Sequence, residues 1–300
     1  MTSLATDTRA GTPSGLADRP RARRTRRAGR GLVSNVVVAL LLVIVMYPLV
    51  WLTLGSFKTQ DEFLNEPFWS LPSSWSLDNY SAAWTAGGLG TYIRNSIVAV
   101  FPALGLIVIL GVAAGFALEV MVFRGRAATL LLFLAGIMVP GQMILLPLFT
   151  IYFRLHLTGT LLPLIITYTA IGLPLTVFMM ATFFRAIPRE IFEASTLDGA
   201  SILRSFWSIG FPMVRNAIFT VALVQFFFIW NDLLIALTFT NSSSLQTIQV
   251  GLLNFTGMYG AVDYGPTFAA ICINVFGTLA LYMVLNQRIM RGLTAGSVKG

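Results

Sequence analysis

The chain has 300 residues, of which 56% are hydrophobic and only 11% are charged, and its formal net charge is +8. A soluble domain carries charge on roughly 25% of its residues, so the composition excludes a soluble protein and indicates one that crosses a membrane several times. Since the chain has a single histidine and a single cysteine, neither a metal site nor an internal disulfide is expected.

The first 31 residues are expected to form a basic, disordered tail in the cytoplasm. Eight arginines precede the first apolar run: Arg9, Arg19, Arg21, Arg23, Arg24, Arg26, Arg27 and Arg30. A basic segment beside a membrane span is typical of the cytoplasmic face, and it favours acidic lipid headgroups as neighbours over nucleic acid. The apolar run that follows is longer than the roughly 7–15 residues of a signal peptide, which indicates a retained span.

Six apolar segments are long enough to cross a bilayer as helices. They cover about 32–54, 93–118, 128–153, 161–184, 214–237 and 267–285. With the N-terminus in the cytoplasm, 17 of the 20 Lys and Arg residues lie inside, and only Lys58, Arg94 and Arg154 lie outside. The predicted fold is an all-α membrane protein with six transmembrane helices over 32–287, a cytoplasmic tail over 288–300 and both termini in the cytoplasm.

The longest outer connection, about 56–92, is rich in aromatic residues, and it favours anchoring in the headgroup layer over a contact with another protein. Prolines are expected to break span three at 139–142 and span four at 172–174, where irregular backbone can line a watery cavity. The alternative is a set of simple kinks that pack against neighbouring helices. The candidate substrate-pathway residues are Gln142, Tyr168, Gln225 and Asn231.

No ionisable residue lies near the middle of a predicted span, so ion coupling lacks its usual groups. Neither lysine sits in a phosphate-binding loop, and no set of nucleophiles, bases or paired carboxylates indicates a catalytic site. An ion-coupled carrier or channel and a membrane enzyme are both disfavoured on these grounds. Work done by this chain therefore requires energy from a partner.

A polar insert at about 186–212 separates spans four and five and is predicted to form two helices in the cytoplasm. Pro188 suits the first turn of a helix, where its missing N–H costs nothing, and Glu190 suits the positive end of the helix dipole. Gly199 is expected to end the first helix in a left-handed conformation, and Ser201 to cap the second. Pro212 is expected to end or kink the second helix. The alternatives are docking into a partner's groove and lying on the membrane surface.

Three segments resemble the maltose-type carbohydrate permeases of binding-protein-dependent ABC importers. The insert is similar to their EAA loop, with Glu193, Ala194 and Ser195 followed by Asp198, Gly199 and Ala200. Trp230-Asn231-Asp232 and the C-terminal segment 287–300 are similar to the smaller permease subunit of that family. Two positions depart from the pattern, because Ser195 replaces an alanine and Asn216 stands where the family often has a second proline.

The resemblance implies that the insert is a coupling helix, seated in a cleft of a separate ATPase subunit. The implied ATPase-coupling residues are Glu193, Ala194, Ser195, Asp198, Gly199 and Ala200. The chain would bind no cofactor itself, because ATP and Mg²⁺ belong to the partner ATPase. The implied partners are a second permease, an ATPase dimer, an extracytoplasmic solute-binding protein and membrane lipids, in the inner membrane of a bacterium. A sugar or oligosaccharide is the expected solute, and the alternative is another polar solute such as glycerol phosphate.

Overall fold

The computed structural model describes residues 22–67, 69–255 and 262–296, with side chains between 34 and 284. The chain divides into two units, Met1–Trp51 and Leu52–Gly300. The regular secondary structure of the described ranges is entirely helical, with α-, 3-10 and π-helical segments and no β-strand. The all-α fold that the apolar segments predict is therefore confirmed.

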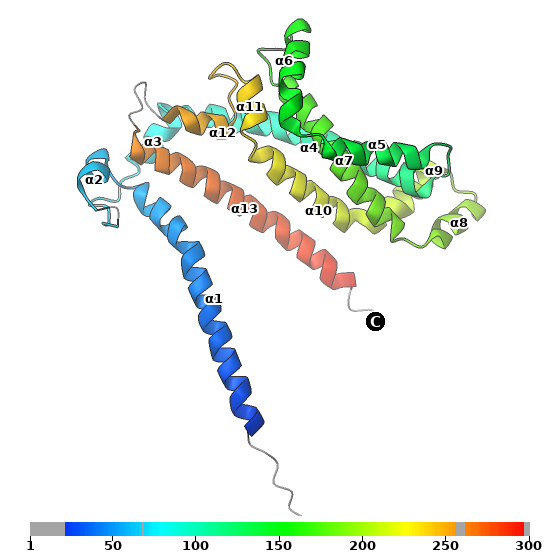
Figure 1. Ribbon diagram of the computed structural model, residues 1–300, viewed down its shortest axis with the longest axis horizontal. Helices are drawn as coiled ribbons and strands as arrows, with labels where there is room; N and C mark the ends of the chain where they lie inside the picture. The colour runs from blue at the N-terminus through cyan, green and yellow to red at the C-terminus, as the bar shows by residue number, and fades with distance from the viewer. Residues whose placement is uncertain (1–21, 68, 256–261, 297–300) are drawn as a thin grey trace, which may run out of the picture. The chain divides into compact units, whose positions relative to one another are not determined.

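Five helical stretches are long and apolar enough to cross a membrane. Two of them are α4 (Leu89–Val120) and α7 (Leu162–Arg185). The others, which belong to α1, α9–α10 and α13, are Ser34–Gly55, Ile202–Trp230 and Tyr264–Val284. A sixth span is counted only if the bent pair Arg126–Met138 and Gly141–Arg154 forms one span. Within the second unit, α4, α7 and α10 pack together and α13 lies against α10 (Figure 1).

Both terminal helices extend beyond their apolar runs. The first, α1 (Ala22–Gly55), begins ten residues before the apolar run, inside the segment that was expected to be a disordered tail. The last, α13 (Tyr264–Gly296), continues through most of the expected C-terminal tail. Arginine is a good helix former, so a helix can continue into a basic segment once the span has nucleated it. Residues 1–21 and 297–300 lie outside the described residues.

The third apolar segment is broken where its proline predicts a break. Helix α5 (Arg126–Met138) is followed by the 3-10 turn η1 (Gly141–Ile144) and by α6 (Leu145–Arg154), and the two halves meet at 90°. Val139 and Pro140 are both extended, and proline disfavours a helical conformation in the residue before it. The expectation of one helix over 128–153 is wrong, whereas the break at 139–142 is confirmed.

The predicted break in span four is wrong, because α7 continues through Pro174. The proline ring packs on Gly136 of α5, where an added Cβ would lie 3.1 Å from the ring Cγ. A neighbouring glycine thus makes room for the proline ring, and Pro174 is packed inside a continuous helix instead of breaking it. Span five also differs from its predicted range, because α10 (Phe211–Trp230) ends at Trp230 and a short helix, α11 (Leu234–Phe239), follows.

Glycines permit the close packing of α4 against α7. Gly111 and Gly115 lie four residues apart on one face of α4 and meet α7 at Thr176 and Met180. A Cβ at Gly115 would lie 2.6 Å from the Met180 Cβ and 2.9 Å from the backbone nitrogen of Ala181. In membranes, where hydrophobic driving force between helices is weak, such small residues let backbones approach and increase van der Waals contact.

The connection between α1 and α4 is held by a buried carboxylate. It contains α2 (Gln60–Asn65) and α3 (Asp78–Thr85). Glu62 accepts hydrogen bonds from the backbone N–H groups of Thr59 and Ser73, both at 2.6 Å, and forms a capping box with Thr59. Hydrogen bonding by Ser73 and then by the Thr59 N–H lowers the pKa of Glu62 from 4.5 to about 2.

This lowered pKa predicts that acid loosens the connection. A carboxylate with a depressed folded pKa stabilises the fold above pH 4.5, and the contribution is lost as the pH falls from 4.5 towards 2. Glu62→Gln should abolish that pH dependence and cost about 1.5–3 kcal/mol, since hydrogen bonds to an ionised group are lost. Hydrogen exchange at the Thr59 and Ser73 amides, corrected for intrinsic rates, measures both effects. Asp61→Asn, at an exposed neighbouring position, should leave the profile unchanged, and an unchanged profile for Glu62→Gln contradicts the prediction.

Candidate functional site

The polar insert folds into a helical hairpin whose ends are set by local sequence. Helix α8 (Arg189–Leu197) is preceded by Pro188 at its N-cap and carries Glu190 in its first turn. It ends in a Schellman motif, in which the N–H of Ala200 donates to the Ser195 carbonyl and the N–H of Gly199 donates to the Thr196 carbonyl. Gly199 has φ +76°, and its Cβ position is open space. The left-handed glycine that the sequence predicts is therefore confirmed.

The second helix of the hairpin leads directly into a membrane span. Ser201 accepts a hydrogen bond from the Arg204 N–H and caps α9 (Ile202–Ser205), as predicted. A π-helical turn, η2 (Phe206–Gly210), then joins α9 to α10. Pro212 lies in the first turn of α10 and does not end the helix, and the alternative of a kink stays a prediction. The wider π turn accommodates the change in backbone pairing next to a proline, and Ile202–Trp230 forms one continuous stretch.

The inner face of the hairpin is packed against α4 and α7. The ring of Phe192 lies edge-on to Phe116 of α4, with centroids 5.8 Å apart, and Phe116 also contacts Phe184 of α7. Ser195 and Ser205, both buried, share a hydrogen bond of 2.7 Å that ties α8 to α9. The sequence indicates only that Ser195 is small, whereas the structure makes it the polar link between the two helices.

Removal of either serine hydroxyl should loosen the hairpin, and removal of both should be better tolerated. Ser195→Ala leaves the Ser205 hydroxyl buried without its partner, which costs about 1–3 kcal/mol. Ser205→Ala should cost a similar amount, and the double variant should cost less than the sum, because no unpaired hydroxyl remains. Hydrogen exchange across α8 and α9 measures the cycle, with the exposed Thr196→Ala as a matched control. Strict additivity of the two single variants would show that the bond contributes nothing.

The outer face of the hairpin exposes both charge and large apolar side chains. Glu193, Ala194, Asp198 and Gly199 are exposed, and Ala200 is partly so. Leu197 is 89% exposed, Leu203 68% and Trp207 62%. The sequence does not indicate that these three apolar side chains are exposed, because exposure depends on how the hairpin packs on α4 and α7. Exposed leucines and a tryptophan beside polar residues are typical of a surface that another protein covers.

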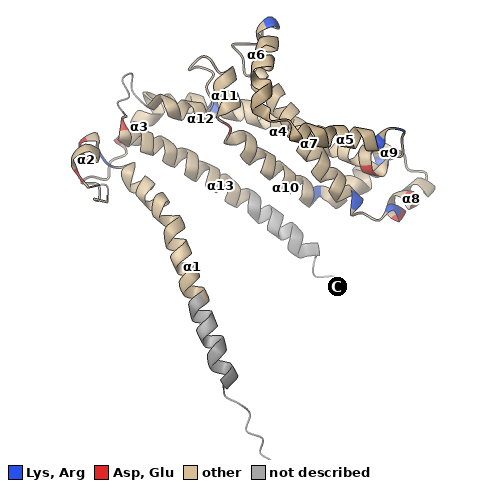
Figure 2. Ribbon diagram, viewed as in Figure 1, with Lys and Arg blue, Asp and Glu red and all other residues tan. Residues whose placement is uncertain are grey.

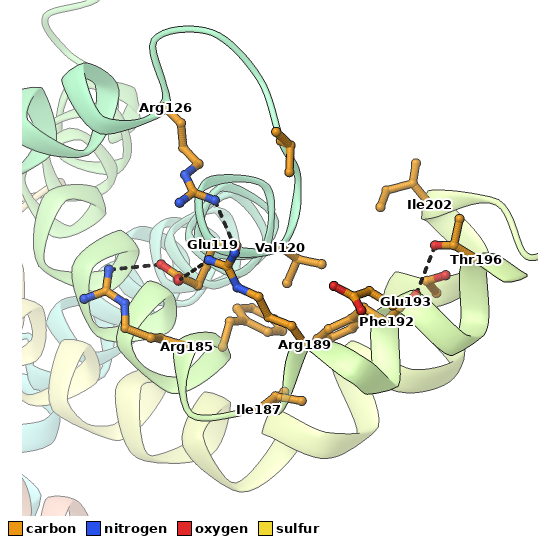
Figure 3. A pocket seen from close by; sticks show the side chains of 13 residues that line it. Glu119, Val120, Arg126, Arg185, Ile187, Arg189, Phe192, Glu193, Thr196 and Ile202 are labelled. Atoms are coloured by element: carbon orange, nitrogen blue, oxygen red, sulfur yellow. Dashed lines mark hydrogen bonds and ion pairs between the residues drawn. The ribbon is translucent and has the colours of Figure 1, made fainter.

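A cavity of about 470 Å³ lies between this hairpin and the ends of α4, α5 and α7 (Figure 3). Glu119, at the end of α4 and 8% exposed, accepts a hydrogen bond of 3.0 Å from Arg185 of α7. Arg189, at the start of α8, lies 3.9 Å from the other carboxylate oxygen. Arg126 of α5 donates to the backbone carbonyl of Glu119. Glu193 lines the same cavity. The buried carboxylate of Glu119 links the hairpin, through Arg189, to the spans α4 and α7.

Charged side chains gather at helix ends throughout the described chain, and the lengths of the spans are almost free of them (Figure 2). In the second unit, most of the arginines coloured in Figure 2 lie near α8 and α9, at the helix ends that surround the hairpin. Glu119 and Arg185 directly follow two of the predicted spans in the sequence. Their pairing could not be predicted, because 66 residues separate them and only the packing of α4 against α7 brings them together.

A second cavity, of about 550 Å³, lies at the bend between α5 and α6 and is closed by α7, α10 and α11. It collects three of the four residues that the sequence assigns to a solute pathway, namely Gln142, Tyr168 and Gln225. Gln225 is buried and its amide donates to the Gly172 carbonyl at 3.0 Å and to the Thr176 hydroxyl at 2.9 Å. A few polar groups in a mostly apolar cavity between helices are typical of a site that a small solute enters.

The fourth predicted pathway residue is replaced by its neighbour. Asn231 is not among the described residues that line the cavity, because its amide donates to the Phe227 carbonyl. Asp232 lines it instead, and its carboxylate accepts hydrogen bonds from the Tyr168 hydroxyl at 3.0 Å and from the N–H of Ala236 at 3.0 Å. Because α10 ends at Trp230, the Asp232 side chain lies at the cavity and accepts hydrogen bonds from the first turn of α11. The sequence predicts a helix that continues to residue 237, and this position of Asp232 could not be predicted from it.

The structure has the features of a multi-span membrane permease. It has five or six apolar spans, a broken helix beside a cavity that holds a few polar groups, and a helical hairpin with exposed apolar side chains. The chain belongs to the family of binding-protein-dependent transport system inner membrane components, which matches residues 107–291. The predicted resemblance is therefore confirmed at the level of the family. Such components lie in the bacterial inner membrane and act with a solute-binding protein.

Two relatives and one solved structure illustrate the match. The chain is 34% identical to the diacetylchitobiose uptake system permease protein NgcG of Streptomyces coelicolor, over 89% of this chain and 88% of that protein. It is 32% identical to the probable ABC transporter permease protein YurM of Bacillus subtilis, over 88% and 87%. It also superposes on a chain of a bacterial ABC transporter that imports the acidic polysaccharide alginate, with TM-score 0.75, 19% identity and coverage of 92% and 99%.

Proposed function

We propose that this chain is one of two permease subunits of an ATP-driven importer for a sugar or oligosaccharide. Family membership and the similarity to a diacetylchitobiose permease support a carbohydrate as the solute. A separate ATPase dimer binds ATP and Mg²⁺, and an extracytoplasmic binding protein delivers the solute. In this proposal the bent pair α5–α6 is the third of six spans, and both termini and the α8–α9 hairpin lie in the cytoplasm, as the distribution of Lys and Arg favours.

The observation that carries the proposal is the exposed face of the hairpin. Glu193 and Asp198 stand beside Leu197, Leu203 and Trp207, on a rigid pair of helices with complete caps at the turn. A short helix of this kind docks in the groove of a partner through its apolar side chains, and its acidic groups set the register. The ATPase provides that groove.

The route from the hairpin to the second cavity is mechanical. Residues 202–230 form one continuous stretch, about 43 Å long at the rise of an α-helix. One end is fixed to α8 by the Ser195–Ser205 hydrogen bond, and the other carries Gln225 and leads to Asp232 at the second cavity. Closure of the ATPase dimer moves the hairpin, and the helical stretch 202–230 transmits this displacement to the walls of the second cavity. The chain itself performs no chemistry, and it passes on a bias between two conformations.

Co-purification with the ATPase subunit tests this assignment. Gly199→Pro should abolish it, because proline fixes φ near −65° and the native φ is +76°. Gly199→Asn is the matched control, since asparagine tolerates the left-handed region. Leu197→Asp and Glu193→Lys should also release the ATPase, without disturbing the spans. Uptake that persists without any ATPase and collapses with a proton ionophore would instead establish an ion-coupled carrier.

A further inference from the structure

The second cavity is lined mostly by apolar side chains, and its described lining includes one acidic residue and no basic one. The acidic residue is Asp232, and the other polar side chains are those of Gln142, Tyr168 and Gln225. Proteins that hold phosphates or carboxylates use arginine, lysine or clusters of N–H groups for this purpose. The described cavity offers none of these side chains to an anion.

The carboxylate of Asp232 is held in place by hydrogen bonds from the groups around it. Its Oδ2 atom accepts from the Tyr168 hydroxyl and from the Ala236 N–H, each at 3.0 Å, and its Oδ1 atom accepts from the Ile235 N–H at 3.4 Å. Donors aimed at both oxygens fix the orientation of this carboxylate at the cavity wall. No described Lys or Arg side chain lines the cavity to pair with it.

The remaining groups suit a neutral solute with many hydroxyls. With only one donor assigned, Oδ1 can accept a further hydrogen bond, and the exposed amide of Gln142 can both donate and accept. Phe228, which is 63% exposed, offers an apolar ring at the same cavity. Hydroxyl groups can pair with each of these partners, whereas an anionic solute would bring a second negative charge into a region of low dielectric.

We propose that this cavity is a transit site for uncharged polyhydroxyl solutes, and that the Asp232 carboxylate excludes anionic ones such as uronates and phosphate esters. The inference rests on the proposed function, and it names the solute class that the second cavity admits. Among the expected solutes it favours neutral sugars over glycerol phosphate. The charge that discriminates is the one that also caps α11, so selectivity and local structure share one side chain.

Two disaccharides that differ by a single carboxylate test the proposal. Binding of cellobiose and of cellobiouronate is measured by saturation-transfer NMR on the full-length chain in nanodiscs with its co-purifying subunits and without binding protein. Wild type should bind cellobiose at least tenfold more tightly than cellobiouronate. Asp232→Asn, which removes the charge and retains an acceptor, should reduce that ratio to below about threefold. Equal binding of the two sugars by wild type, or no binding of cellobiose, would overturn the proposal.

A second variant covers the case in which Asp232→Asn disturbs α11. Gln142→Lys places a cation at an exposed position of the cavity wall and leaves the cap intact. It should raise cellobiouronate binding at least tenfold relative to cellobiose binding. No gain for the anionic sugar would contradict the charge assignment. If the ATPase still co-purifies, such a failure concerns this inference alone, and the proposed function stands.

Discussion

Gly115→Val is expected to be the most destabilising single change in the membrane-spanning part of the protein. The added Cβ would lie 2.6 Å from the Met180 Cβ and 2.9 Å from the Ala181 backbone nitrogen. A side chain can rotate away, but a backbone atom moves only if the whole helix moves, so α4 and α7 must separate. Overpacking of this kind costs about 3 kcal/mol. The effect is measured as a change in Tm of the detergent-solubilised protein, with the amount of monodisperse protein that remains after heating as the signal.

The same helix supplies a matched control. Gly105 lies two turns before Gly111 on α4, and an added Cβ there meets no atom within 4 Å. Gly105→Val makes the same chemical change in the same helix without a clash. Its Tm should stay close to that of wild type, whereas the Tm of Gly115→Val should fall clearly. Equal Tm values for the two variants would show that close contact of α4 and α7 is not what these glycines provide.

Glu119→Arg is expected to detach the hairpin from the spans that hold it. The buried carboxylate pairs with Arg185 at 3.0 Å and lies 3.9 Å from Arg189. The substitution replaces both attractions with repulsion among arginines. The two guanidinium groups are 62% and 66% exposed, so solvent screens part of this energy, and a loss of about 1–2 kcal/mol is expected for the neutral Glu119→Gln. The arginine variant should lose more.

Hydrogen exchange at the amides of α8 distinguishes these cases. A loss of about 1.4 kcal/mol corresponds to tenfold faster exchange, so Glu119→Gln should accelerate exchange of α8 by about tenfold and Glu119→Arg by more. Glu190→Gln removes an acidic group from the first turn of α8 but breaks no contact to α4, and it should change exchange by less than threefold. If high salt leaves the difference between wild type and Glu119→Gln unchanged, the pairing with exposed arginines is not its cause.

The presence of several apolar spans and the turn of the hairpin could be predicted from the sequence, for local reasons. Apolar runs predict spans because the hydrocarbon core requires about 20 apolar residues in a helix, wherever the neighbours lie. The left-handed Gly199 and the Ser201 cap follow from backbone conformations and hydrogen bonds within five residues. The break at Pro140 follows from a missing N–H and a clash with the preceding residue.

Tertiary structure decided everything that joins distant segments. Whether a proline breaks a helix depends on the space beside it, and Gly136 gives Pro174 that space. The carboxylate of Glu119 meets Arg185 because α4 packs on α7, and Tyr168 meets Asp232 because α10 ends about two turns before the predicted span does. A linear pattern records which groups a chain has. Only the packing of helices, through close approach and rotation about each axis, determines which of those groups face one another.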